Sequence, residues 1–182
     1  MRVYIGLGAN LGDPAATFAR AARELGRVGR LTRASGLYAS APRDLTDQPE
    51  FTNAVLELRS PMSPVELLGV CKRIELILGR DPHGVRFGPR VLDLDILAIV
   101  DRCVDDPEHD LRVPHPRLAE RRFALEPLAE IEPMLRPWAV CPEDHRSTLT
   151  VTDALAAITG QEVRRVAGPE WVTVGQAPAS DR

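Results

Sequence analysis

The stretch that decides the fold is residues 86–97, which read Arg-Phe-Gly-Pro-Arg-Val-Leu-Asp-Leu-Asp-Ile-Leu. The run from Val91 to about Ile99 is typical of a strand, on which side chains alternate faces with a period of two. Asp93 and Asp95 therefore share a face, with their Cα atoms roughly 6.6 Å apart. The opposite face is expected to point into the core and carries Leu92, Leu94, Ile96 and Ala98.

Two neighbouring carboxylates repel each other unless a cation lies between them. No Cys or His adjoins Asp93 and Asp95, so the sequence favours a hard, oxygen-binding ion, Mg²⁺ rather than Zn²⁺. Just upstream, Arg86 and Arg90 flank a stiff Phe-Gly-Pro. Arginines beside carboxylate-held Mg²⁺ suit the triphosphate of a nucleotide. The alternative is a pair of carboxylates that face water, and the arginine-rich loop leading into the pair argues against it.

Composition limits the class of protein. The 182 residues are enough for one domain with a proper core, and the net charge of −3 argues against a nucleic-acid-binding surface. Cys71, Cys103 and Cys141 are an odd number without metal or redox spacing, which predicts reduced thiols in a cytosolic protein. We see neither a signal peptide nor a membrane-spanning stretch. We therefore expect a cytoplasmic protein that contacts no membrane and works as a monomer.

The order of expected elements predicts the fold class. Strands are expected at residues 2–7, 31–41, 51–59 and 91–99, and helices from Asp13-Pro14 to Gly26 and from Ser63 to Gly79. Ser63 and Glu66 form a capping box, and Asp13 is a good N-cap. The order β-α-β-β-α-β predicts an α+β, ferredoxin-like core, with two helices on one face of an antiparallel sheet.

Further elements are expected after this core. Short helices fit residues 117–120, 123–130 and 151–159, and a short strand fits 162–166. The last dozen residues resemble a loose tail. Nothing marks a second domain, so we expect one domain over residues 1–160, with residues 161–182 packed on it or trailing from it. No motif identifies a role for the segment after about Pro137.

Other motifs are open to two interpretations. The spacing Gly6-x-Gly8-x-x-x-Gly12 lacks the features of a nucleotide-binding glycine loop, and a tight strand-to-helix turn explains the glycines better. Phe51 and Asn53 share a strand face, where a ring and a carboxamide suit a flat heterocycle. Taken alone, Phe51 is better explained as core and Asn53 as a residue at the sheet end.

Lone residues on the second helix and in the later loops are also ambiguous. Glu75 suits the exposed face of a charged helix, and His115, between two prolines, suits a structural hydrogen bond.

Taken together, the motifs resemble the family of 6-hydroxymethyl-7,8-dihydropterin pyrophosphokinase, an enzyme of folate biosynthesis. The matching segments occur in order at residues 8–12, 47–53, 73–75, 79–80, 87–97, 113–116 and 121–123. The string Gly-Pro-Arg-x-x-Asp-Leu-Asp-Ile-Leu is highly specific, and the string Asp-Gln-Pro-x-Phe-x-Asn accompanies it. The ferredoxin-like core of the family agrees with the order of elements predicted above.

The resemblance implies transfer of a pyrophosphoryl group from ATP to the pterin hydroxymethyl, with release of AMP. It implies that Asp93 and Asp95 hold two Mg²⁺ ions and that they act with the catalytic arginines Arg80 and Arg90. The positions implied for ATP binding are Glu75, Arg90, Ile96, His115 and Arg121. Those implied for the pterin are Ser40, Pro42, Phe51, Asn53 and Phe123. Loops 41–50 and 81–89 are implied to close over the substrates.

Two other classes remain open. A nucleotidyltransferase palm can also place an Asp pair on such a sheet, but it predicts basic nucleic-acid grooves. The other class is a small-ligand or RNA-binding module of the same fold. RNA binders of this kind carry aromatic-rich central strands, which this chain lacks at 4% aromatic residues.

Overall fold

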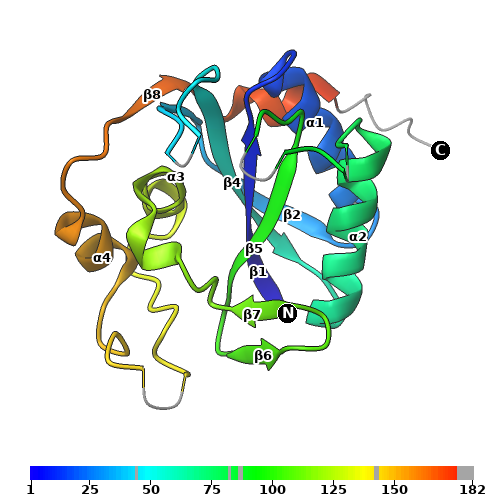
Figure 1. Ribbon diagram of the computed structural model, residues 1–182. Coiled ribbons are helices and arrows are strands. Elements are labelled where there is room, and N and C mark those ends of the chain that lie inside the picture. The colour runs from blue at the N-terminus through cyan, green and yellow to red at the C-terminus, as the bar shows by residue number, and fades with distance from the viewer. Residues whose placement is uncertain (44, 82, 86–87, 142–143, 176–182) are drawn as a thin grey trace.

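The protein is described here by a computed structural model covering residues 1–43, 45–81, 83–85, 88–141 and 144–175 (Figure 1). It is a mixed α/β protein built on an antiparallel sheet with the strand order β5-β1-β4-β3-β8, in which β2 also pairs with β4. The main-sheet strands are β1 (Arg2–Ala9), β2 (Arg30–Ala34), β3 (Leu37–Ser40), β4 (Phe51–Arg59), β5 (Asp93–Ile99) and β8 (Val163–Ala167). A small hairpin, which we had not predicted, joins β6 (Val104–Asp106) and β7 (Leu111–Val113).

Local sequence signals set several boundaries as predicted. The bounds of β4 match the prediction, and α1 (Pro14–Leu25) begins where the Asp13 side chain accepts a hydrogen bond from the Ala16 amide. The capping box of Ser63 and Glu66 starts α2 (Pro64–Ile77). These signals work because each satisfies backbone amides that the first helical turn leaves unpaired.

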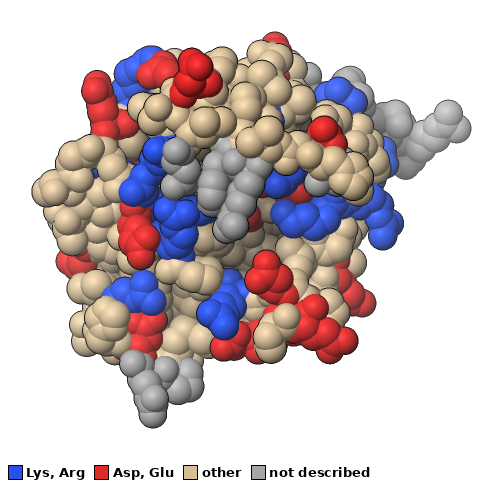
Figure 2. Space-filling view, in the orientation of Figure 1, with Lys and Arg blue, Asp and Glu red and all other residues tan. Residues whose placement is uncertain are grey.

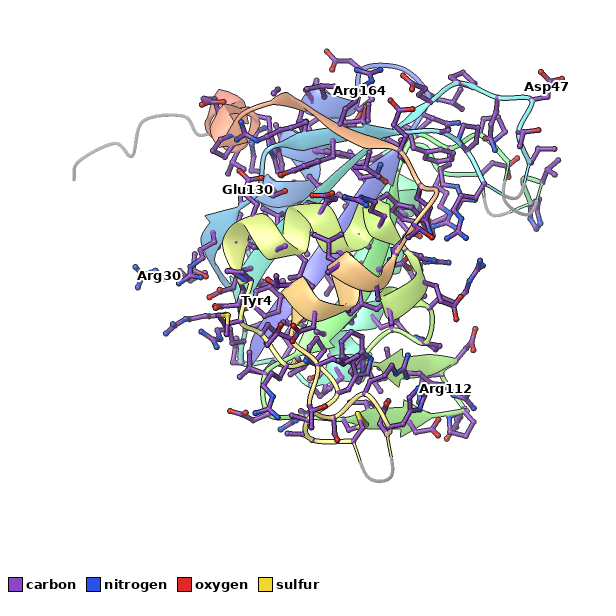
Figure 3. All side chains as sticks on the ribbon, turned by 90° about the vertical axis from the view of Figure 1, so that its left-hand side faces the viewer. Tyr4, Arg30, Asp47, Arg112, Glu130 and Arg164 are labelled. Atoms are coloured by element: carbon purple, nitrogen blue, oxygen red, sulfur yellow. A yellow bond between two sulfur atoms is a disulfide. The ribbon has the colours of Figure 1, made fainter. Side chains whose placement is uncertain are left out.

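Helices cover both faces of the sheet. The helices α1 and α2 pack on one face, as predicted, and α3 (Arg122–Ile131) and α4 (Val151–Ala157) lie on the other (Figure 1). On β1, Val3, Ile5 and Leu7 face α1 and α2, whereas Tyr4 faces the α3 and α4 side. At the end of α3, Glu130 accepts hydrogen bonds from Tyr38 and Gly36, which ties the helix to β3 (Figure 3).

The expected strand over residues 31–41 is wrong in one respect, because the chain forms two strands with a break at Ser35 and Gly36. The Ser35 amide donates to the Val55 carbonyl, while its hydroxyl accepts from the Val55 amide. A Cβ on Gly36 would lie 2.4 Å from the Ala167 carbonyl oxygen, so only glycine lets β8 approach this closely. The break therefore lies beside the end of β8, which pairs with β3 from Leu37 to Ser40.

The predicted alternation along β5 also fails at one residue. Its pairing with β1 shifts register between Tyr4 and Ile5, so that Ile96 lies opposite Ile5 and Ala98 opposite Tyr4. Ala98 consequently packs with Leu97 on the α3 side rather than with the core that faces α1 and α2. An extra residue of this kind turns the following side chains to the other face of the sheet.

The expected loose tail is wrong for Trp171, which lies in a 3₁₀ helix, η2 (Pro169–Gly175), and is only 4% exposed. Its ring packs against Phe18, and its indole N–H donates to the Ser35 carbonyl at 2.8 Å. The chain after β8 thus contributes to the core between α1 and the sheet. Residues 176–182 lie outside the described part of the chain.

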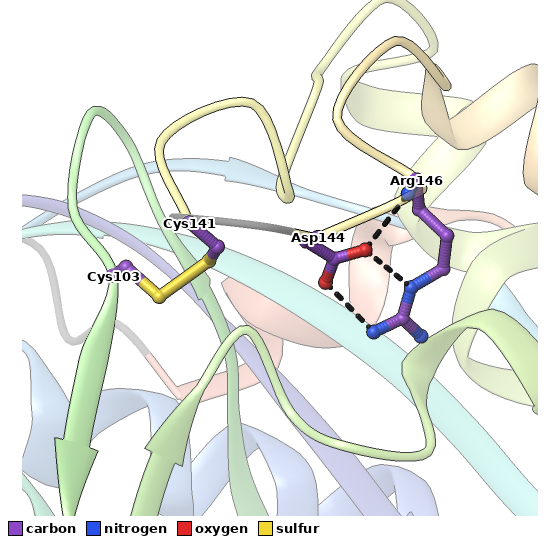
Figure 4. The surroundings of a disulfide bond; sticks show 4 residues. All are labelled: Cys103, Cys141, Asp144 and Arg146. Atoms are coloured by element: carbon purple, nitrogen blue, oxygen red, sulfur yellow. Dashed lines mark hydrogen bonds and ion pairs between the residues drawn. A yellow bond between two sulfur atoms is a disulfide. The ribbon is translucent and has the colours of Figure 1, made fainter.

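The prediction of three reduced thiols is also wrong, because Cys103 and Cys141 form a disulfide (Figure 4). It links the turn after β5 to a loop in residues 132–182, which follow α3 and are called the C-terminal segment below. In the same loop, Asp144 and Arg146 form an ion pair (Figure 4). Sequence spacing did not reveal the bond because its two cysteines are 38 residues apart. Cys71 is a buried free cysteine, and burial raises the pKa of its thiol to about 12.

Candidate functional site

The floor of the candidate site is a row of residues across three neighbouring strands. Gly8 on β1 lies opposite Asp93 on β5 and opposite Asn53 on β4. In the next row, Gly6 lies opposite Asp95. The predicted common face of Asp93 and Asp95 is thus found, and it is the face that α3 partly covers.

Gly6 and Gly8 do not form the strand-to-helix turn that we expected, because both lie within β1. Only Gly12 has the left-handed backbone, with φ of 71°, that such a turn requires. A Cβ on Gly8 would lie 3.7 Å from Asn53 Oδ1 and 3.9 Å from Asp93 Cβ. The missing side chain of Gly8 therefore leaves an open floor between the carboxamide and Asp93, whereas Leu97 fills the space above Gly6, 3.2 Å from where a Cβ would lie.

A pocket of about 120 Å³, partly open to solvent, rises from this floor. Its lining includes all five residues predicted for the pterin, which are Ser40, Pro42, Phe51, Asn53 and Phe123. Its lining also includes Arg90, Asp93, Asp95 and Arg121 from the predicted nucleotide and metal set. Figure 2 shows Lys and Arg side chains on both sides of the hollow at the centre of this face.

Asn53 is held firmly at the aromatic end of the pocket. It is 5% exposed, and its Nδ2 donates to Ser40 Oγ at 2.9 Å and to the Tyr38 carbonyl at 3.3 Å. With its donor engaged, the carboxamide presents Oδ1 toward the glycine floor. A fixed acceptor beside Phe51 can pair with N–H groups on the edge of a flat ring.

Asp93 lies between the two arginines predicted to be catalytic. Its Oδ1 pairs with Arg80, and its Oδ2 accepts from Arg90 Nη1 at 2.8 Å. Burial by itself would raise the pKa of Asp93, but the two guanidinium groups outweigh burial and hold it below its usual value. Asp93 is therefore ionised, and its charge is compensated by the guanidinium groups of Arg80 and Arg90.

Glu75 is not the exposed helix residue that its position suggested, because it is 2% exposed. Its carboxylate accepts from the Leu94 amide at 2.7 Å, pairs with Arg80 Nη1 at 2.7 Å and pairs with Lys72 Nζ at 3.0 Å. Burial raises the pKa of Glu75, and Lys72 opposes that rise. Glu75 thus connects α2, the Asp strand and the arginine that reaches Asp93.

Asp95 has a different environment from Asp93. Burial raises the pKa of Asp95, and the nearby Asp93 carboxylate raises it further. Asp95 Oδ2 forms an ion pair with Arg121 Nη1, at 3.6 Å. The negative charge of Asp95 is compensated less closely than that of Asp93, which lies between two arginines. A bound cation would therefore stabilise the ionised form of Asp95 more.

His115 and Arg121 direct nitrogen atoms to the same place. His115 Nδ1 accepts from the Arg117 amide at 3.1 Å, so the proton of the neutral ring belongs on Nε2, which lies 3.4 Å from Arg121 Nη1. Burial lowers the pKa of His115 and favours this neutral form. Two donors side by side suit an anionic acceptor such as a phosphate oxygen.

Asn10 is a site residue that the sequence analysis missed. Its Oδ1 accepts from the Arg90 amide at 2.8 Å, and its own amide donates to the Arg90 carbonyl at 3.0 Å. Its Nδ2 donates to Gln48 Oε1 at 2.9 Å and to the Pro49 carbonyl at 3.1 Å. One side chain thus joins the arginine loop to the loop that carries Gln48, a link that local sequence could not reveal.

Other predicted positions fare differently. The Ile96 side chain is 4% exposed and packs in the core on the opposite face of the sheet, so only its main chain can face a ligand. Arg86 and Phe87 lie outside the described residues. Arg43, Leu97 and Arg117 also line the pocket, although we had not predicted them.

The residues present fit a hard divalent ion only in part. Within the described ranges, no group of three or more His, Cys, Asp or Glu side chains is placed to hold a metal. Asp93 and Asp95 supply oxygen ligands of the right kind. The remaining ligands would have to come from substrate and water, as is usual for Mg²⁺ beside a nucleotide.

The fold and the pocket together define a class of protein. An Asp pair beside arginines, next to an aromatic-walled pocket, suits an enzyme that transfers phosphoryl groups.

Comparisons with known proteins give the family. Residues 4–133 match the family model described as 7,8-dihydro-6-hydroxymethylpterin-pyrophosphokinase (HPPK). A Pseudomonas aeruginosa protein named 2-amino-4-hydroxy-6-hydroxymethyldihydropteridine pyrophosphokinase is 42% identical over 137 residues, which is 74% of this chain and 83% of that protein. A protein of the same name from Methylorubrum extorquens is 40% identical over 167 residues, which is 91% of this chain and 98% of that protein. The chain belongs to the HPPK family.

Solved structures share the fold. An HPPK-DHPS structure from Plasmodium falciparum superposes with a TM-score of 0.64 at 14% identity, over 85% of this chain and 45% of that one. The chain therefore spans less than half of that solved chain.

Proposed function

We propose that this protein transfers the diphosphate group of ATP to the hydroxymethyl group of 6-hydroxymethyl-7,8-dihydropterin in folate biosynthesis, giving AMP and the pterin diphosphate. The observation that carries the proposal is one pocket in which Asn53 and Phe51 lie across a glycine floor from Asp93 and Asp95. Family membership supports the same reaction.

The aromatic end of the pocket suits the acceptor. Phe51 and Phe123 offer two ring faces for stacking, and Asn53 Oδ1 offers an acceptor to the amino and ring N–H groups of a pterin edge. Ser40 and Pro42 complete this end. The glycine floor would let the bicycle lie close to β1, with its hydroxymethyl group directed toward the carboxylates.

The acidic end suits a metal-bound triphosphate. We propose that Asp93 and Asp95 hold Mg²⁺, two ions in all, which would neutralise charge on the transferred group and the leaving AMP. Arg80 and Arg90 are then freed from Asp93 to engage phosphate oxygens, and His115 Nε2 and Arg121 supply further donors. Glu75 keeps Arg80 in reach, and the Ile96 main chain stays a proposed nucleotide contact.

Alignment and charge neutralisation are the main demands of phosphoryl transfer through a loose transition state. The arginines supply positive charge, and the Asn10 link helps alignment because it joins the arginine loop to the loop that carries Gln48. Closing these loops over the substrates would exclude water and limit ATP hydrolysis.

We also assign the core to the ferredoxin-like class, because β1, α1, β2 with β3, β4, α2 and β5 follow the β-α-β-β-α-β order in an antiparallel sheet. No helix in the described part of the chain is long and apolar enough to cross a membrane. We propose a cytoplasmic monomer with ATP and the pterin as its partners, although the disulfide between Cys103 and Cys141 removes the argument from reduced thiols.

The test is to measure nucleotide products from ATP and Mg²⁺, with and without 6-hydroxymethyl-7,8-dihydropterin. AMP that forms only with the pterin, without ADP, is the expected result. Primer extension on DNA would instead favour a nucleotidyltransferase. Ligand binding without any turnover would favour a binding module.

A further inference from the structure

Arg121, which faces Asp95, occupies a joint of the backbone between two helical elements. It is the single residue between a 3₁₀ turn, η1 (Leu118–Glu120), and α3, and its backbone is extended, with φ of −114° and ψ of 93°. As the residue before α3, it makes no side-chain cap for the helix. Something else must therefore hold this joint.

The Gln161 side chain brackets the joint from both sides. Its Oε1 accepts from the Arg122 amide at 3.1 Å, and its Nε2 donates to the Glu120 carbonyl at 2.9 Å. One carboxamide thus satisfies the first amide of α3 and the last carbonyl of η1. Both groups are immediate neighbours of Arg121.

The same carbonyl is also linked to the pterin end of the pocket. Arg43 Nη1 donates to the Glu120 carbonyl at 2.8 Å, and Arg43 itself lines the pocket beside Pro42. The Glu120 carbonyl therefore joins the loop after β3 to the C-terminal segment. Gln161 lies outside residues 4–133, the part of the chain that matches the family.

We propose that Gln161 is a positioning residue for the transfer reaction, which places Arg121 against Asp95 and Phe123 against the acceptor. The inference rests on the proposed function. Arg121 Nη1 lies 3.6 Å from Asp95 Oδ2, and a small displacement of a group at this distance can cost much of a rate. The C-terminal segment then completes the site as well as packing on the core.

Two variants at one position separate positioning from stability. Gln161→Glu keeps the acceptor for the Arg122 amide, and a carboxylate there favours the helix start. It loses the donor to the Glu120 carbonyl and adds a negative charge next to Arg121. Gln161→Leu loses both bonds. Thr152→Val is the matched control, because it removes a hydrogen bond to the Pro133 carbonyl elsewhere in the same C-terminal segment.

The experiment measures melting temperature, kcat, and KM for ATP and for the pterin in the full chain with Mg²⁺. Gln161→Glu should keep its melting temperature, because the carboxylate at the start of α3 offsets the lost bond to Glu120, while the displaced Arg121 raises KM for ATP about fivefold. Gln161→Leu should lose about fivefold to thirtyfold in kcat/KM for both substrates. Thr152→Val should change neither KM.

Wild-type kinetics in the Gln161→Glu variant would overturn the proposal, because helix capping alone would then explain the residue. If Gln161→Leu does not fold, the KM of Gln161→Glu for ATP still tests the positioning role. If the wild type releases no pterin-dependent AMP, the proposed function fails. Calorimetric titration of the wild type and Gln161→Glu with a non-hydrolysable ATP analogue then tests the positioning role separately.

Discussion

Gly8→Ala should make the protein more stable and less active. Gly8 lies in β1 without a left-handed φ, and a Cβ there would meet its nearest neighbours at 3.7 and 3.9 Å, which are ordinary contacts. The fold can therefore accept alanine, and the loss of unfolded-state freedom should add about 0.5–1 kcal/mol to the free energy of unfolding. For a chain of this size, that raises the melting temperature by about 1–4 °C.

The same methyl group would stand on the pocket floor between Asn53 and Asp93. Forcing a ligand against an added methyl group typically costs about 1–3 kcal/mol, which corresponds to roughly 5-fold to 150-fold weaker pterin binding. Calorimetric titration with the pterin and thermal unfolding measure the two effects. Gly69→Ala is the matched control, since Gly69 is an open helical position where alanine should raise stability without changing binding.

Equal pterin affinity in Gly8→Ala and wild type would refute the placement of the acceptor on the glycine floor. A lower melting temperature would refute the claim that the site, rather than the fold, requires this glycine.

Four other tests address separate parts of the structure. Asn53→Ala should weaken pterin binding by roughly 1–3 kcal/mol, because polar groups of the ring edge lose their partner, and unchanged affinity by calorimetry would show that the site is misplaced. Asn10→Ala should lower kcat/KM for both substrates by roughly 10-fold to 100-fold, since it unties both loops, and an effect on one substrate alone in steady-state kinetics would contradict that link. Replacing Cys103 and Cys141 with serine should lower the free energy of unfolding by about 4 kcal/mol for a 38-residue separation, and urea titration giving equal midpoints for the two proteins would contradict it. The buried Cys71, whose thiol pKa is raised to about 12, should react with a thiol reagent at pH 8 only after unfolding, and prompt labelling of the native protein would count against its burial.

Sequence predicted those features that depend on residues close together in the chain. The face shared by Asp93 and Asp95 and the one shared by Phe51 and Asn53 follow from strand alternation, and the helix starts at Asp13 and Ser63 follow from capping chemistry. The resemblance then brought the two faces into one site, and the pocket contains both pairs.

Features created by distant contacts could not be predicted in this way. Gly6 and Gly8 seemed to be turn residues because nothing local shows that Asn53 and Asp93 lie on either side of Gly8. Glu75 seemed exposed because the strand amide and the arginine that it binds come from other segments. Likewise, nothing local shows that the Ser35 carbonyl accepts from the indole of Trp171, which is 136 residues further along the chain.

The central claim is that Asp93 and Asp95 support transfer of the diphosphate group, while the aromatic end of the pocket binds the pterin. The most direct measurement compares wild type with Asp95→Asn for pterin-dependent AMP release and for pterin binding without nucleotide. The account predicts that the variant binds the pterin as the wild type does and loses AMP release by at least about a hundredfold, because Asp95 no longer supports the charge of the transferred group. An Asp95→Asn protein with wild-type AMP release would contradict the account.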